Sequence, residues 1–107
     1  MLNELKIPYD TEIMDFADLK KEPFESVNPN GRVPAIEDPN TGITLWESGA
    51  IIEYLLETYD TTHEFSYTSS PEKYLQQSWL HLQVSGQGPY FGQRAWFVLV
   101  STSKKRA

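Results

Sequence analysis

The 107-residue chain has no cysteine, only two histidines and no long apolar run. Without cysteine it has no disulfide bond, no thiolate metal site and no cysteine nucleophile. His63 and His81 lie apart from each other and from acids at ligand spacing, so we expect no metal site. No segment approaches the roughly 20 apolar residues of a membrane span, and the first residues do not resemble an export signal. We expect a cytoplasmic protein with no membrane association.

Basic residues are scarce, with 9 Lys and Arg against 15 Asp and Glu and a formal net charge of -6. Three of the basic residues, Lys104, Lys105 and Arg106, are adjacent at the end, so the rest of the chain is more acidic than the total suggests. This charge balance disfavours nucleic-acid binding.

Two short motifs stand out in a chain long enough for one small domain and the start of another. Residues 28–34 read Asn-Pro-Asn-Gly-Arg-Val-Pro, and residues 46–51 read Trp-Glu-Ser-Gly-Ala-Ile. Between them, the short apolar runs 34–37 and 43–46 flank the turn-rich residues 38–42, a pattern that predicts a β-hairpin.

The residues after the second motif have helical spacing. From Ser48 to Tyr59, apolar side chains recur every three or four residues, which predicts an amphipathic helix with Ser48 as its N-cap. Residues 60–70 lose this period and read as a linker. Pro71 restarts a helix that we expect to end at Gly86.

Four further segments have weaker patterns. We expect the end of a short helix before Pro8, a strand over Tyr9 to Phe16, and a loop with a short helical turn over residues 17–27. The glycine-containing residues 86–92 follow a helix and lack the lysine of a phosphate loop, so they predict an interhelical turn.

Val33-Pro34 has two interpretations. A trans proline is tolerated at the start of a strand, where no ladder N–H is required, and trans bonds are much the commoner. Alternatively, a cis bond would turn the backbone of Val33 toward a groove, where it could pair with an extended ligand as an added strand does. The spacing of the residues leaves both interpretations open.

Glu47-Ser48 also has two interpretations. Ser48 could simply cap its helix while Glu47 complements the helix dipole. The same helix start could instead bind a ligand carboxylate through its N–H groups and the Ser48 hydroxyl, with Glu47 taking an ammonium group. Arg32 could meet a second ligand carboxylate or form an ordinary surface ion pair.

Together, residues 28–36, residues 46–51 and Tyr54-Leu55 resemble the cytosolic glutathione transferases. Residues 83–93 further resemble the fungal glutathione-transferase-like nitrogen regulators and the bacterial enzymes similar to them. The resemblance spans Leu2 to Phe97 and implies an α/β thioredoxin-like N-terminal domain over residues 1–60. A linker over 61–70 and the beginning of an all-helical C-terminal domain over 71–107 would follow.

The resemblance also implies roles for the motif residues. Val33 would pair through its backbone with the cysteinyl part of glutathione, and Pro34 would be the cis-proline. Glu47 and Ser48 would hold the γ-glutamyl end, and Arg32 would lie near the glycyl carboxylate. Glutathione would be the cosubstrate, the partner a small electrophile or disulfide, and the intact protein a homodimer.

The chain departs from the family at both ends. In the family the thiol-activating group follows the first strand, and Leu2 to Leu5 resembles the end of the next helix, so the first strand and every catalytic residue are expected to be missing. Residues 98–107 depart from the helical pattern. We therefore expect the chain to be a fragment of a glutathione transferase-like protein, without catalytic activity and of low stability. The alternatives are a non-catalytic regulator that acts through protein association, or a thioredoxin-fold module for another ligand.

Overall fold

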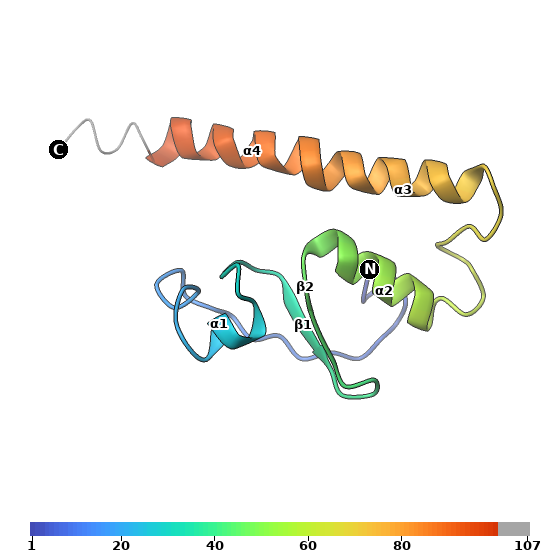
Figure 1. Ribbon diagram of the computed structural model, residues 1–107, viewed down its shortest axis with the longest axis horizontal. Coiled ribbons are helices and arrows are strands. Elements are labelled where there is room, and N and C mark those ends of the chain that lie inside the picture. Colours follow the sequence, from blue (N-terminus) through green and yellow to red (C-terminus); the bar gives the residue numbers. More distant parts are fainter. Residues whose placement is uncertain (101–107) are drawn as a thin grey trace. The chain divides into compact units, whose positions relative to one another are not determined.

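The computed structural model describes residues 1–100 and the side chains of residues 1–98. The chain divides into two compact units, Met1–Ser66 and Tyr67–Ala107, called here the N-terminal and C-terminal units. In Figure 1 the N-terminal unit holds the blue, cyan and green elements, and the C-terminal unit holds the orange helix. The domain boundaries expected from the sequence stay a prediction.

The sheet formed by the described residues is an antiparallel hairpin of two strands. Strands β1 (Ala35–Asp38) and β2 (Ile43–Trp46) pair with Ala35 opposite Trp46 and Asp38 opposite Ile43. The turn between them closes where the N–H of Gly42 donates to the Asp38 carbonyl at 2.8 Å, with Gly42 at φ 73°. The hairpin predicted from the sequence is confirmed.

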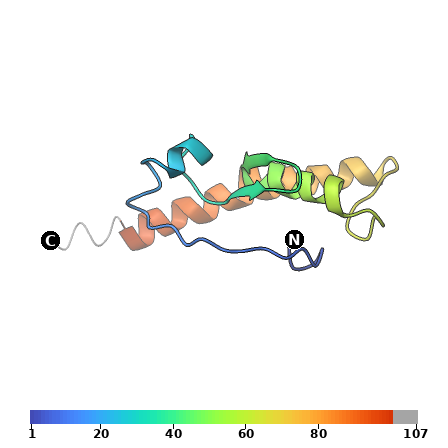
Figure 2. The same cartoon turned by 90° about the horizontal axis from the view of Figure 1, so that it is seen from below.

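Helix α2 (Ser48–Tyr59) lies beside the hairpin in both Figure 1 and Figure 2. It buries Ile51 and Leu55, which are 7% and 4% exposed, and Leu19, from the turns of residues 16–23, is also buried. These side chains form the small apolar core of the unit, and Ile51 and Leu55 lie four residues apart, a spacing that places them on one face of α2. The predicted helix is confirmed.

The first third of the chain is less regular than the sequence suggested. Residues 2–6 form turns, because a single turn gains too few hydrogen bonds to persist as a helix. The expected strand from Tyr9 to Phe16 is wrong: the segment is irregular, and Ile13 and Phe16 are 91% and 92% exposed. A strand needs a neighbour, and this segment pairs with neither strand of the described sheet. Helix α1 (Phe24–Val27) is the helical turn expected within residues 17–27.

Residues 72–100 of the C-terminal unit form one continuous helical rod (Figure 1). The rod consists of α3 (Glu72–Leu82), a π-helical turn η1 (Gln83–Gln87), α4 (Gly88–Ala95) and a second π-helical turn η2 (Trp96–Val100). No helix of the described residues is both long and apolar enough to cross a membrane.

Three expectations for this unit are therefore wrong. The helix does not end at Gly86, and residues 86–92 are helical, because the N–H of Gly88 donates to the Gln83 carbonyl and a π-helical turn carries the helix across Gly86. The expected departure from the helix at Val98 is also wrong as far as Val100, where the π-helical turn η2 ends. The remainder of that segment, 101–107, lies outside the described residues.

Candidate functional site

The loop before β1 is organised around a buried asparagine. Asn28 is 2% exposed, and its Nδ2 donates to the Arg32 carbonyl at 2.5 Å while its Oδ1 accepts the N–H of Asn30 at 2.9 Å. Its carbonyl accepts the N–H of Gly31 at 2.8 Å, and Gly31 adopts φ 58°, which glycine reaches at little cost. A single side chain thus fixes both ends of the turn that leads into Val33-Pro34.

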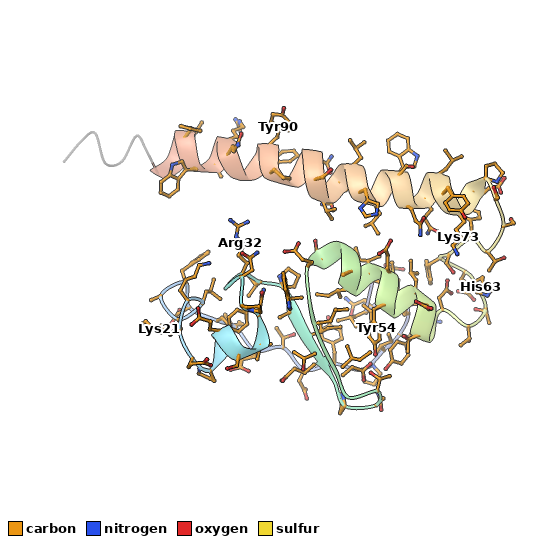
Figure 3. All side chains as sticks on the ribbon, in the orientation of Figure 1. Lys21, Arg32, Tyr54, His63, Lys73 and Tyr90 are labelled. Carbon is orange, nitrogen blue, oxygen red and sulfur yellow. The ribbon has the colours of Figure 1, made fainter. Side chains whose placement is uncertain are left out.

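The three candidate residues of this loop are exposed at the start of β1. Val33 is 58% exposed, and the Val33-Pro34 peptide bond is cis, which is the second of the two interpretations of the sequence. In Figure 3 the Arg32 side chain extends outward from the loop. Arg32 and Val33 are therefore both accessible on the surface of the N-terminal unit.

The second motif places an acid in an unusual backbone conformation. Glu47 lies between β2 and α2 at φ 71° and ψ 117°, where a non-glycine residue costs on the order of 1–3 kcal/mol. Such residues persist where their surroundings hold them, and they cluster at ligand sites. The observed N-cap is Glu47 rather than Ser48, which corrects the sequence-based interpretation of Ser48 as the cap. Because the Glu47 side chain does not cap the helix, it does not compete for the N–H groups at the start of α2.

One hydrogen bond joins the two motifs. Nδ2 of Asn30 donates to Oε1 of Glu47 at 3.4 Å, across 17 positions of sequence. The structure thus brings the loop that carries Arg32 and Val33 to the start of α2. Sequence reasoning assigned no role to Asn28 or Asn30, although two asparagines around a proline and before a glycine are a signal for side-chain-stabilised turns.

A second polar cluster fastens α2 to the tip of the hairpin. Oδ2 of Asp38 accepts the hydroxyls of Tyr54, at 2.6 Å, and of Tyr59. The Tyr54 donor is the main cause of the lowered pKa of Asp38, and the Asp38 acceptor raises the pKa of Tyr59. Tyr54 lies between α2 and the hairpin in Figure 3. The helical pattern of the sequence had indicated only an apolar role for these two tyrosines.

A second carboxylate that accepts several hydrogen bonds, that of Asp60, lies at the C-terminal end of α2. Asp60 is 4% exposed and accepts the N–H groups of Glu64 and Phe65, at 2.9 and 3.1 Å, and the hydroxyl of Ser66 at 2.6 Å. The Ser66 donor is the main cause of the lowered pKa of Asp60. Within residues 1–100, no group of three or more His, Asp or Glu could hold a metal ion.

Comparison with known families decides what this fold is. The family model described as "Glutathione S-transferase, N-terminal domain" matches residues 1–58. The chain belongs to the glutathione S-transferase family. This membership confirms both the predicted family and the predicted fold class, a thioredoxin-like N-terminal domain followed by helix.

Individual relatives agree with the family assignment. The glutathione S-transferase-like protein OpS6 of Beauveria bassiana is 52% identical over 96 residues, which are 90% of this chain and 44% of that protein. Protein URE2 of Candida maltosa is 40% identical over 103 residues, covering 91% of this chain and 31% of its own length. The chain therefore spans less than half the length of these relatives.

A solved structure extends the comparison to three dimensions. The glutathione transferase URE2P6 of Phanerochaete chrysosporium, determined with oxidized glutathione, matches with a TM-score of 0.87 and 45% identity. The match covers 92% of this chain and 47% of that protein. At this level of identity, the similarity supports a comparison of sites as well as of folds.

Proposed function

We propose that the N-terminal unit binds glutathione and that the intact protein transfers it to small electrophiles or uses it to reduce disulfides or peroxides. The observation that carries the proposal is the Asn30–Glu47 hydrogen bond, which joins the cis-proline loop to the start of α2. The complex of a 45% identical glutathione transferase with oxidized glutathione supports the choice of ligand.

The chemistry of glutathione matches the groups that the two motifs offer. Its γ-glutamyl end carries a carboxylate and an ammonium on one carbon. We assign the carboxylate to the N–H groups at the start of α2 and to Ser48, and the ammonium to Glu47. The backbone of Val33 next to Pro34 would pair with the cysteinyl part, and Arg32 would attract the glycyl carboxylate.

The motifs position glutathione, and a further group must activate its sulfur. A transferase lowers the pKa of the bound thiol so that thiolate is present at neutral pH. We assign no residue of this chain to that step. In this proposal the chain contributes ligand positioning, and the intact protein is a homodimer.

Titration of the chain with glutathione tests the binding site. Glu47→Gln removes the charge that pairs with the ammonium, and Ser48→Ala removes a hydroxyl donor. Because a hydrogen bond to a charged group contributes about 1.5–3 kcal/mol, we expect each variant to lose at least about tenfold in affinity. Isothermal titration calorimetry measures the loss.

Two control variants match these changes in residue type. Glu57→Gln alters an exposed acid near the other end of α2, and Ser78→Ala alters an exposed serine of α3. Both should bind glutathione as the unsubstituted chain does. The absence of binding by the unsubstituted chain, or equal affinities across all four variants, would refute the proposed site.

The alternative is a non-catalytic regulator that acts through protein association. It is favoured by the exposed aromatic side chains of the C-terminal unit, among them Trp79 and Tyr90, which are 70% and 76% exposed. An assay of the protein as its host expresses it, with a generic electrophile and with a glutathione disulfide, separates the two functions. Turnover supports the enzyme, and binding without turnover supports the regulator.

A further inference from the structure

We propose that Asn30 is a positioning residue that orients Glu47 for the ammonium group of the ligand. This inference rests on the proposed function, since it concerns the same glutathione site. Asn30 would not touch the ligand's sulfur, and it would act through the carboxylate of Glu47.

The first observation is that the side chain of Glu47 is weakly constrained. It is exposed and makes no hydrogen bond to the start of α2. A free glutamate side chain samples many rotamers, and a ligand that needs one of them must bear the entropy of ordering it. The Nδ2 of Asn30, at 3.4 Å from Oε1, restricts that freedom before the ligand arrives.

The second observation is that Asn30 is itself firmly anchored. Its N–H donates to Oδ1 of the buried Asn28 at 2.9 Å, and its carbonyl accepts Nζ of Lys20 at 2.5 Å. Asn28 also donates to the Arg32 carbonyl. A chain of hydrogen bonds therefore runs from a buried side chain to the exposed carboxylate of Glu47, and the same anchor sets the backbone next to Val33.

The third point concerns the two oxygens of the Glu47 carboxylate. An amide donor engages Oε1 of Glu47 and leaves Oε2 for an incoming ammonium, which an ionised carboxylate binds by a charge-assisted hydrogen bond. Asn30 should therefore affect ligands that carry this ammonium and leave unaffected ligands that lack it. A residue that only maintained the loop would affect both kinds of ligand equally.

Two peptides separate these cases: glutathione, and glutaryl-cysteinylglycine, which is glutathione without its α-ammonium group. For Asn30→Ala we expect about a tenfold loss of affinity for glutathione and less than a twofold change for the glutaryl peptide, by calorimetric titration of the chain. The matched control is Asn40→Ala, another exposed asparagine whose Nδ2 donates to a side chain, the Tyr59 hydroxyl, at 3.3 Å. It should change neither affinity.

The outcomes are distinct. Equal losses for the two peptides in Asn30→Ala, or no loss for either, would overturn the positioning role and leave the proposed function standing. If the unsubstituted chain binds neither peptide, the proposed function and this inference are overturned together. A selective loss for glutathione supports both.

Discussion

The N-terminal and C-terminal units differ in the range of the interactions that shape them. In the N-terminal unit, the hydroxyl of Tyr54 reaches Asp38 across 16 positions of sequence. In the C-terminal unit, the hydroxyls of Ser78 and Ser85 donate to carbonyls only four residues back. The first unit is shaped by long-range contacts, and the second is a helix built from local ones.

The two units also differ in how far their apolar side chains are buried. Leu55 of α2 is 4% exposed, whereas Leu75 of α3 is 56% exposed. Chemistry that needs side chains from several segments can therefore be assembled in the N-terminal unit. Secondary structure by itself orders a backbone, whereas tertiary contacts brought Asn30 to Glu47.

The largest expected effect comes from Leu55→Ala, with Leu75→Ala as its matched control. Truncating a buried leucine costs about 2–5 kcal/mol, against about 5–15 kcal/mol for a whole domain. We expect Leu55→Ala to lower amide hydrogen-exchange protection in α2 by at least about tenfold. Leu75→Ala should change the free energy of unfolding by no more than about 0.5 kcal/mol. Similar losses of protection in both variants would mean that the two units do not differ in this way.

A smaller effect should appear as pH falls. Asp38 and Asp60 of the N-terminal unit have folded-state pKa values below the ordinary 3.8. Each therefore adds to the free energy of unfolding at pH values above 3.8, and this contribution is lost as pH falls through the lowered folded-state pKa. Urea unfolding at several acidic pH values measures how steeply the free energy of unfolding falls with pH. Asp60→Asn should make this fall less steep, and an unchanged pH dependence would contradict the assignment.

The smallest effect is expected for Tyr59→Phe at high pH. The pKa of Tyr59 is raised above the ordinary 10.0 by its bond to Asp38, so its contribution is complete below pH 10.0 and is lost as pH rises through the raised value. The unsubstituted chain should lose stability in this alkaline range more steeply than Tyr59→Phe, measured by urea unfolding. Tyr67→Phe, an exposed tyrosine control, should retain the steeper loss.

Much of the fold could be predicted because its signals are local. The turn-rich residues 38–42 between two apolar runs predicted the hairpin, and the spacing after Ser48 predicted α2. The errors occurred where a local pattern lacked the partner it needs or met a stronger local bond. Tyr9 to Phe16 has strand composition without a pairing strand, and the helix continues past Gly86 because a π-helical turn joins α3 to α4.

The candidate site was only partly predictable for the same reason. Arg32, Val33, Pro34, Glu47 and Ser48 were proposed from two motifs, and the site that they form remains a proposal. The links between the motifs were missed. Asn30 was assigned no role, because its hydrogen bond to Glu47 spans 17 positions and leaves no trace in local spacing.

Residue identity and short-range spacing were enough to predict the family, the hairpin and α2, and to exclude cysteine chemistry in this chain. The folded structure was needed to show that Asn28 is buried and that Asn30 reaches Glu47. Burial depends on the segments that pack around a side chain, and the Asn30–Glu47 hydrogen bond spans 17 positions, so neither follows from residue spacing.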